Sequence, residues 1–497
     1  MRIKSLAIAC LVPCLAILVS CEADNGLRLP ARENPFFDTT GKTLVARIVH
    51  ISDLHMVDEE SPARFAGAQV ITRSAWRPYE AYSTQLLDGI LRSANRIHAA
   101  NRPVTFLVET GDACDNSQMN ELEWLLGVFD GEMINPLTGP DDRSPAAKAD
   151  PLMDPHAPFQ AQGLYRNGIH GASDSIPWYG VFGNHDVYSI GVFPILEDAS
   201  GKRTAPLPLD RRPDIVLPGL LDPVGFLAHG NVTPAEPGPP NLFEFPRFVQ
   251  PNPKRAFFNK REFIRAMFST KTGPSGHGFT DPETGPSWYS LSPVPGLRLI
   301  GLDSCDPAHQ IPGFFYMDGS ISEAQLSFLR EELAAAQARG ELVIVASHHP
   351  SASLQAIYGT AVVGSGFRAV LNEYPNVILH LAGHSHRNRV SDREGYLEIE
   401  TCSTLDMPQE GRVIEIWRDD SDGSVSIAYE MFSHLDETAP ALGDDPLRLL
   451  RAEARKIAMG DSGAAARLQL LDPSGANPAG VPSDRKGVYI VTPVSNR

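Results

Sequence analysis

The sequence predicts an α/β layered fold, because short apolar runs alternate with amphipathic helical patterns along most of the chain. The apolar runs have the length of buried strands, and the segments between them repeat apolar residues at helical spacing. The composition agrees with this fold class, since 497 residues that are 42% hydrophobic and 21% charged are sufficient for a large buried core. We therefore expect sheets whose faces are covered by helices.

The predicted elements follow one another in α/β order. Ser322 is a suitable N-cap for the third predicted helix, and Gly340 follows its last turn. Asp422 and Gly423 form a turn signal between two alternating segments, residues 412–417 and 424–429, which predicts a hairpin. The predicted strands are 44–51, 104–108, 177–182, 297–302, 342–346 and 377–381, and the predicted helices are 79–100, 120–129, 322–339, 367–372 and 446–459.

The N-terminus has the pattern of a targeting segment. Arg2 and Lys4 precede an uncharged apolar stretch, residues 6–19, that is too short to span a bilayer comfortably. The stretch ends in Leu-Val-Ser-Cys, which resembles the processing box of bacterial lipoproteins and implies that Cys21 is lipidated and becomes the new N-terminus. We expect a signal peptide at 1–20 and a membrane-anchored, extracytoplasmic protein, periplasmic or on the cell surface. A plain secretory signal that contains a cysteine is the alternative.

The formal net charge of −17 argues against a nucleic-acid-binding surface, which needs clustered lysine and arginine. Beyond the proposed anchor, Cys114, Cys305 and Cys402 remain. An odd number of cysteines allows at most one disulfide and one leftover thiol in an oxidising compartment. Each of the three follows an apolar run, so buried free thiols are an equally open interpretation.

Proline-rich stretches interrupt the α/β pattern twice. Residues 131–176 contain six prolines and residues 187–253 contain thirteen. We interpret them as insertions of about 131–176 and 187–286 that lie over one face of the sheet, the second of which shapes a substrate pocket. A flexible excursion without function is the alternative. The insertions belong to a domain of residues 44–434, which a polar leader (21–43) precedes and a C-terminal extension (435–497) without assigned chemistry follows.

Five of the apolar runs each lead directly into a short segment rich in Asp, Asn and His. Ligands of open α/β sheets bind beyond the carboxyl ends of the strands. Neutral imidazoles combined with carboxylates and an amide oxygen suit Zn, Mn or Fe, whereas an all-oxygen set suits Mg or Ca. The five segments are Ser52-Asp53-Leu54-His55, Thr110-Gly111-Asp112, Gly183-Asn184-His185-Asp186, Ser347-His348-His349-Pro350 and Gly383-His384-Ser385-His386.

This ordered set, D-x-H, G-D, G-N-H-D, H-x-P and G-H-x-H, resembles the calcineurin-like metallophosphoesterases, a superfamily that includes the purple acid phosphatases. The motifs span residues 53–386. The resemblance implies a four-layer β-sandwich flanked by helices and two divalent transition-metal ions. It implies one metal held by Asp53, His55 and His386, a second held by Asn184, His348 and His384, and Asp112 bridging them. His348 is preferred over His349 because the family's ligand lies two residues before the proline.

The resemblance also implies a reaction, in which two dications activate a water that attacks a phosphate ester. His185 contacts the phosphoryl oxygens or the leaving group, and Asp186 orients it. Purple acid phosphatases have a tyrosine ligand at the position of Asp115, so a coloured ferric-tyrosinate site is not expected, and Mn, Fe and Zn stay open. A phosphodiesterase acting on headgroup-like or nucleotide-like esters is slightly favoured over a phosphomonoesterase. A non-catalytic binding or surface-assembly lipoprotein on the same scaffold is the alternative.

Overall fold

A computed structural model describes most of the chain between the polar leader and the C-terminus. The predicted signal peptide, Cys21 and residues 205–251 of the second proline-rich insertion lie outside the described residues. Among the helices that are described, none is both long enough and apolar enough to cross a membrane. The described residues are 27–28, 37–61, 77–100, 102–138, 154–167, 171–204, 252–305, 318–355, 363–435, 447–460 and 477–491.

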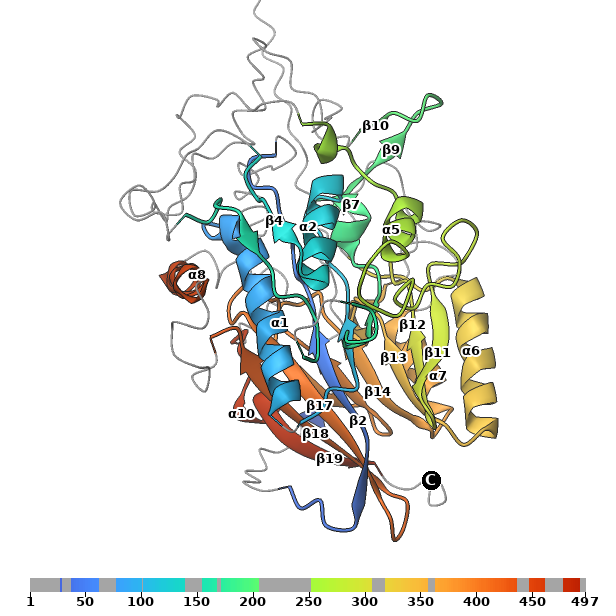
Figure 1. The fold of residues 1–497 in the computed structure, drawn as a ribbon. Helices are drawn as coiled ribbons and strands as arrows, with labels where there is room; N and C mark the ends of the chain where they lie inside the picture. Colours follow the sequence, from blue (N-terminus) through green and yellow to red (C-terminus); the bar gives the residue numbers. More distant parts are fainter. Residues whose placement is uncertain are drawn as a thin grey trace, which may run out of the picture.

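Two large mixed sheets form the centre of the molecule (Figure 1). In the first sheet, β12, β13, β14 and β16 run parallel to one another, and in the second, β2, β3 and β6 do so. The first sheet has the order β1 (Leu27–Arg28), β15 (Arg389–Asp392), β16 (Leu397–Glu400), β14 (Val377–Ala382), β13 (Leu342–Ala346), β12 (Leu297–Gly301), β11 (Tyr289–Val294). The second has the order β19 (Lys486–Val491), β18 (Val425–Ser433), β17 (Glu410–Asp419), β2 (Lys42–Ile51), β3 (Phe106–Glu109), β6 (Trp178–Gly180).

Helices cover the outer faces of both sheets, which gives four layers (Figure 1). Side chains on β13 alternate between two cores: Ile344 packs with the second sheet, whereas Val343 and Val345 pack against the helices on the other face. The predicted α/β fold is confirmed. The helices are α1 (Ser83–Ala99) and α2 (Met119–Asp130) beside the second sheet, α6 (Glu323–Ala338) and α7 (Gly364–Asn372) beside the first, and α5 (Lys260–Met267), α8 (Arg448–Gly460) and α10 (Pro482–Arg485).

The predicted elements agree with the observed ones to within a few residues at most ends. The Ser322 hydroxyl accepts a hydrogen bond from the Gln325 amide, as expected of an N-cap. β17 and β18 form the predicted antiparallel hairpin, with Gly423 at φ +73° in its turn. The predicted helix 79–100 divides into a 3-10 turn, η3 (Glu80–Tyr82), and α1.

The described parts of the insertions contain more structure than the expected irregular loops. α5 begins at a capping box, in which the Asn259 side chain accepts from the Glu262 amide at 2.9 Å and Glu262 accepts in return at 3.0 Å. The remaining short elements are the strand pairs β4 (Met133–Ile134) with β5 (Phe159–Gln160), β7 (Tyr188–Ser189) with β8 (Phe193–Pro194) and β9 (Leu196–Glu197) with β10 (Arg203–Thr204), and the 3-10 turns η5 (Asn184–Asp186), η6 (Pro253–Arg255) and η8 (Ser351–Ser353).

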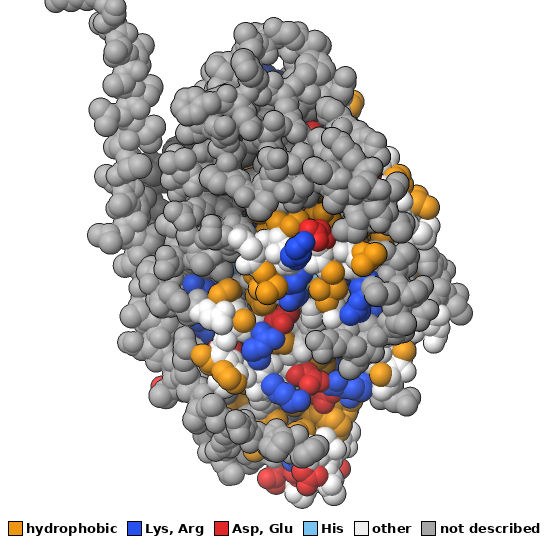
Figure 2. Space-filling model, turned by 90° about the vertical axis from the view of Figure 1, so that its left-hand side faces the viewer, with side chains coloured by type: hydrophobic (Ala, Val, Ile, Leu, Met, Phe, Trp, Pro, Cys, Tyr) orange, Lys and Arg blue, Asp and Glu red, His pale blue; other side chains and the backbone are white. Residues whose placement is uncertain are grey.

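The C-terminal extension contributes to the fold. β19 pairs with β18 as an edge strand of the second sheet, and α8 packs its Leu450 and Ala454 into a cluster with Leu86 of α1. Figure 2 views the molecule from the left-hand side of Figure 1. In the described part of this face, Lys and Arg side chains lie among acidic and hydrophobic ones.

Cys114, Cys305 and Cys402 are free and buried in the structure. The interpretation of these three cysteines as buried free thiols is therefore the one that agrees with the structure.

Candidate metal centre

The five polar segments meet where the parallel strands end. Asp53, Asp112 and Asn184 follow the adjacent strands β2, β3 and β6 of the second sheet. His348 and His384 follow the adjacent strands β13 and β14 of the first. The structure brings all seven predicted ligands into one cluster between the sheet ends, in which six are buried and His384 is half-buried. They are Asp53, His55, Asp112, Asn184, His348, His384 and His386.

The glycines of the motifs allow these segments to pack backbone against backbone. A Cβ added at Gly183 would lie 2.0 Å from the amide nitrogen of Asp112, and one at Gly111 would lie 2.5 Å from the amide nitrogen of Gly183. A Cβ at Gly383 would lie 2.4 Å from Asp53 Oδ2. Gly183 has an ordinary φ of −100°, so the glycine is needed there for this close approach and not for its backbone conformation.

Five of the seven predicted ligands adopt the left-handed backbone region, which side-chain-bearing residues rarely occupy. Such conformations cost free energy and persist only where the surrounding structure imposes them, as at functional sites. Their φ angles are +51° for Asp53, +45° for His55, +55° for Asp112, +69° for His384 and +53° for His386.

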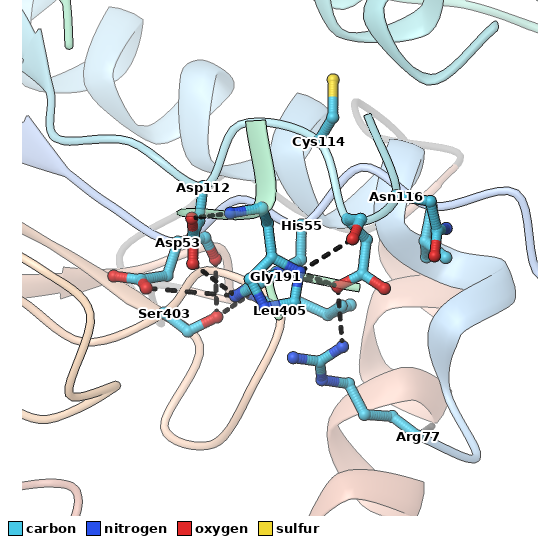
Figure 3. A network of polar contacts seen from close by, with 12 residues as sticks. Asp53, His55, Arg77, Asp112, Cys114, Asn116, Gly191, Ser403 and Leu405 are labelled. Carbon is cyan, nitrogen blue, oxygen red and sulfur yellow. Dashed lines mark hydrogen bonds and ion pairs between the residues drawn. The ribbon is translucent and has the colours of Figure 1, made fainter. Parts of the chain in front are cut away.

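The first half of the cluster contains Asp53, His55 and His386. Figure 3 shows Asp53 and His55 within this half. His55 Nδ1 lies 2.8 Å from Asp115 Oδ1, and His386 Nδ1 lies 2.7 Å from Asp406 Oδ2, so both Nδ1 atoms donate to carboxylates. Each neutral ring then has a lone pair on Nε2, and these two atoms lie 3.0 Å apart. Two acceptors cannot satisfy each other, so this geometry fits a cation between them.

The second half repeats this arrangement with different partners. His348 Nδ1 donates to the Thr110 carbonyl at 2.8 Å, which leaves Nε2 as an acceptor in the neutral ring. That Nε2 faces Asn184 Oδ1 at 3.0 Å, and His384 Nδ1 lies 3.2 Å from the same oxygen. The Asn184 amide is oriented by its NH₂ group, which donates to the Gly191 carbonyl at 3.0 Å. The donor set therefore fits a second divalent cation.

Asp112 lies between the two halves. Its Oδ2 is 3.2 Å from His348 Nε2 and 3.8 Å from His55 Nε2, while Oδ1 accepts from the His185 amide at 2.8 Å. Burial would raise the pKa of Asp112, but His348 and His185 hold it well below its usual range. One ionised carboxylate thus faces both sets of imidazoles, as a bridging ligand must.

Without a metal, protons neutralise this cluster. Burial lowers the pKa of His386, but the Asp53 charge raises it to about 10. Burial likewise lowers the pKa of His348, and Asp112 raises it to about 9. These two imidazoles therefore carry protons at neutral pH in the metal-free chain, in positions where a bound cation would replace them.

The structure corrects one predicted partnership. Asp186 does not touch the His185 ring: its Oδ1 accepts from the Cys114 amide and its Oδ2 from the Gly183 amide, both at 2.9 Å. His185 Nδ1 donates instead to the backbone carbonyl of Asp115 at 2.8 Å and lies 3.4 Å from its Oδ1. Asp115 therefore orients His185, and Asp186 fixes the loops around it.

The groups that hold the first-half imidazoles were not predicted from the sequence. From the sequence, Asp115 stands out only because purple acid phosphatases have a tyrosine ligand at this position, three residues after Asp112. That resemblance predicts no role for Asp115 itself. Asp406 lies in a loop after β16 and belongs to none of the five motifs. His349, the residue passed over in favour of His348, bonds to the Ser304 hydroxyl through Nδ1 at 2.8 Å.

Comparison with known proteins places this centre in a family. The model of the calcineurin-like phosphoesterase family matches residues 46–388. The curated proteins contain no match to the chain.

Similar solved structures include a dimetal phosphatase from Danio rerio, with 14% identity over 79% of this chain and 98% of that chain and a TM-score of 0.38. The Thermus thermophilus sulfate thiohydrolase SoxB has 10% identity, covering 84% and 61% of the two chains, with a TM-score of 0.35. A putative 5'-nucleotidase from Staphylococcus aureus has 12% identity, covering 82% and 57%, with a TM-score of 0.33. Since these scores are low, the assignment rests on the family model. That model spans all five motifs, and the chain therefore belongs to the calcineurin-like phosphoesterase family and is a metal-dependent phosphoester hydrolase.

Proposed function

We propose that the chain hydrolyses a phosphate diester at a dinuclear centre outside the cytoplasm. The observation that carries the metal assignment is the 3.0 Å approach of His55 Nε2 to His386 Nε2, two acceptors that a shared cation reconciles. When bound, two divalent ions of Mn, Fe or Zn supply an activated water and neutralise the phosphoryl oxygens. The first position would be held by Asp53, His55 and His386, the second by Asn184, His348 and His384, and Asp112 would bridge them.

His185 is suited to act on the leaving group. Its Nδ1 is used by the Asp115 carbonyl, which leaves Nε2 for a substrate. A Cβ added at Gly191 would lie 2.2 Å from Nε2, so a glycine at this position keeps the nitrogen uncovered. Because Nδ1 carries the proton of the neutral ring, donation to the departing alkoxide requires the imidazolium form, in which Nε2 carries a second proton.

The charge distribution supports a diester over a monoester. A phosphate diester carries one negative charge at neutral pH, whereas a phosphate monoester carries nearly two. The protein is itself acidic, with a formal net charge of −17. Arg77 is buried beside the centre and bound to Asp115 and Asp406, so this arginine is not free to bind the second charge of a monoester. On its approach to the centre, a diester therefore meets less long-range repulsion from this acidic chain than a monoester does.

The extracytoplasmic location is supported by the N-terminal sequence alone, in which residues 1–20 resemble a lipoprotein signal peptide that ends before Cys21. We expect the mature chain to be lipidated at Cys21 and to partition with membranes. Expression of the full chain and of Cys21→Ala in a bacterial host, followed by fractionation and mass analysis of the N-terminal peptide, tests this. Recovery of the unmodified chain with an intact N-terminus in the cytoplasm would contradict it.

The activity is tested by turnover of bis(p-nitrophenyl) phosphate against p-nitrophenyl phosphate after reconstitution with Mn²⁺, Fe²⁺ or Zn²⁺ in separate samples. We expect faster hydrolysis of the diester, and a loss of about 10²–10⁴-fold in His185→Ala that leaves both metals bound. Faster hydrolysis of the monoester would overturn the diester assignment. Absence of hydrolysis of either compound by metal-loaded protein would favour the binding-lipoprotein alternative.

A further inference from the structure

Arg77 is a fully buried arginine placed behind the first half of the cluster (Figure 3). Its Nε donates to Asp406 Oδ1 at 2.8 Å, and its Nη1 donates to Asp115 Oδ1 at 3.1 Å. Its own backbone amide donates to Glu80 Oε1 at 2.9 Å, which fixes the start of this segment. One guanidinium therefore joins two carboxylates that are far apart in the sequence.

Each of these carboxylates holds one imidazole of the cluster. Asp115 Oδ1 accepts from His55 Nδ1 at 2.8 Å, and Asp406 Oδ2 accepts from His386 Nδ1 at 2.7 Å. Both imidazoles face Asp53 and would bind the same metal. A carboxylate that accepts from Nδ1 fixes the tautomer of the ring, so that the lone pair of Nε2 points at the metal.

We propose that Arg77 is a positioning residue that sets the affinity of the first metal position by holding Asp115 and Asp406 in place. This inference rests on the proposed dinuclear centre. Two buried carboxylates this close to one another repel, and a single buried guanidinium compensates both. Only arginine offers donors in a planar fork that reaches two carboxylates together, since a lysine presents one point charge.

The second metal position has no corresponding device among the described residues. His348 Nδ1 donates to a backbone carbonyl, that of Thr110, and the Asn184 amide donates to the carbonyl of Gly191. Neither contact involves Arg77, Asp115 or Asp406. Removal of the guanidinium is therefore expected to weaken one metal position and to spare the other, an asymmetry that general destabilisation would not produce.

The experiment measures the Mn²⁺ bound per chain by equilibrium dialysis against graded free Mn²⁺, with the mature chain and with Arg77→Met and Arg77→Lys. We expect two equivalents in the unmodified protein. In Arg77→Met one equivalent is expected to bind about 10–100-fold more weakly, with the other unchanged, and Arg77→Lys is expected to be intermediate.

The matched control is Arg255→Met, because Arg255 is equally buried and its Nε lies 2.7 Å from a buried carboxylate of Asp58. That pair touches none of the seven ligands, so this variant is expected to lose stability and to keep both equivalents. Arg255→Met and Arg77→Met losing the same equivalents would show that the effect is general unfolding and would overturn the inference.

Tyr79→Phe keeps the inference testable if Arg77→Met does not fold. The Tyr79 hydroxyl donates to Asp406 Oδ1 at 2.6 Å, so its removal loosens the same carboxylate with a smaller change. A several-fold weaker first equivalent is expected. Unchanged binding of both equivalents in the folded variants would refute the role of Arg77, whereas an unmodified protein that binds fewer than two Mn²⁺ would refute the dinuclear centre itself.

Discussion

His55 and His386 present their Nε2 atoms to each other at 3.0 Å, while a carboxylate holds the opposite nitrogen of each ring. Such an arrangement is unfavourable for two neutral imidazoles, since both Nε2 atoms are acceptors. The arrangement becomes favourable when a cation lies between the two Nε2 atoms. In the metal-free chain, a proton on His386 takes this place, because the pKa of His386 is raised to about 10. Proton and metal therefore compete for the same lone pairs, which makes metal binding pH-dependent.

Metal affinity is expected to rise with pH up to about 10, the pKa of His386 in the metal-free chain. In the metal-free chain, burial lowers the pKa of both imidazoles, but Asp53 raises that of His386 to about 10 and Asp112 raises that of His348 to about 9. Both protons must leave before metal binds. Calorimetric titration with Mn²⁺ in buffers of different ionisation enthalpy should report proton release at neutral pH. Binding without proton release would contradict the assignment of these two residues as ligands.

The same shifts predict the stability of the metal-free protein. An imidazole whose pKa is raised on folding stabilises the folded state below its unfolded pKa of about 6.5, and this contribution is lost as the pH rises through the folded value. For His348 and His386 the loss extends from about pH 6.5 to about pH 10. The melting temperature of chelator-treated protein should fall over this window, and added Mn²⁺ should restore it. His348→Asn should reduce the pH dependence of the chelated protein.

Asp112→Asn tests whether the two metal positions are linked. The side chain faces both imidazole sets through Oδ2, so loss of its charge removes a ligand from each position at once. Hydrolysis should fall by at least about 10²-fold, and both equivalents of metal should bind more weakly. Metal analysis and turnover are measured on the same sample. A protein that kept full activity and both metals would exclude a bridging role.

The fold and the ligand cluster were predictable because both follow from local patterns. Buried parallel strands appear as short apolar runs, and their carboxyl ends meet at one edge, so the Asp, Asn and His that follow them converge. Asp53 and His348 are far apart in the sequence yet lie in one cluster for this reason. α5 was missed although Asn259 and Glu262 form a readable capping box, because the surrounding proline-rich sequence suggested irregular structure.

The partners of the ligands were less predictable because they depend on tertiary packing. Asp186 is next to His185 in the sequence, but both lie in the 3-10 turn η5, where successive side chains point in different directions. Asp115, which reaches His185 and His55, comes from the segment after β3. Arg77 and Asp406 belong to no motif, and only the assembled sheets bring them together.

Gly183→Ala is expected to disrupt the centre although its backbone conformation suits any residue. The new Cβ would lie 2.0 Å from the Asp112 amide nitrogen and 2.1 Å from its Oδ1, so two ligand-bearing segments must separate. We expect destabilisation of about 4 kcal/mol or more and loss of tight metal binding. Gly171→Ala is the control, since a Cβ there meets nothing within 4 Å, and its effect should stay within about 0.5 kcal/mol. The free energies of unfolding of both variants are measured by urea denaturation. If Gly183→Ala is as stable as Gly171→Ala, a close-approach role for Gly183 is excluded.

Asp115→Asn and Asp186→Asn distinguish the two carboxylates near His185. Asp115 contacts the Nδ1 atoms of both His55 and His185, so its neutralisation should lower turnover by about 10–100-fold and shift the pH profile of kcat. Asp186 accepts two backbone amides and touches neither ring. An asparagine has one acceptor oxygen and leaves one amide unpaired, which should cost about 1–3 kcal/mol of stability and leave the kcat of folded protein within a few-fold. The reverse pattern, with Asp186→Asn inactive and Asp115→Asn active, would restore Asp186 as the partner of His185.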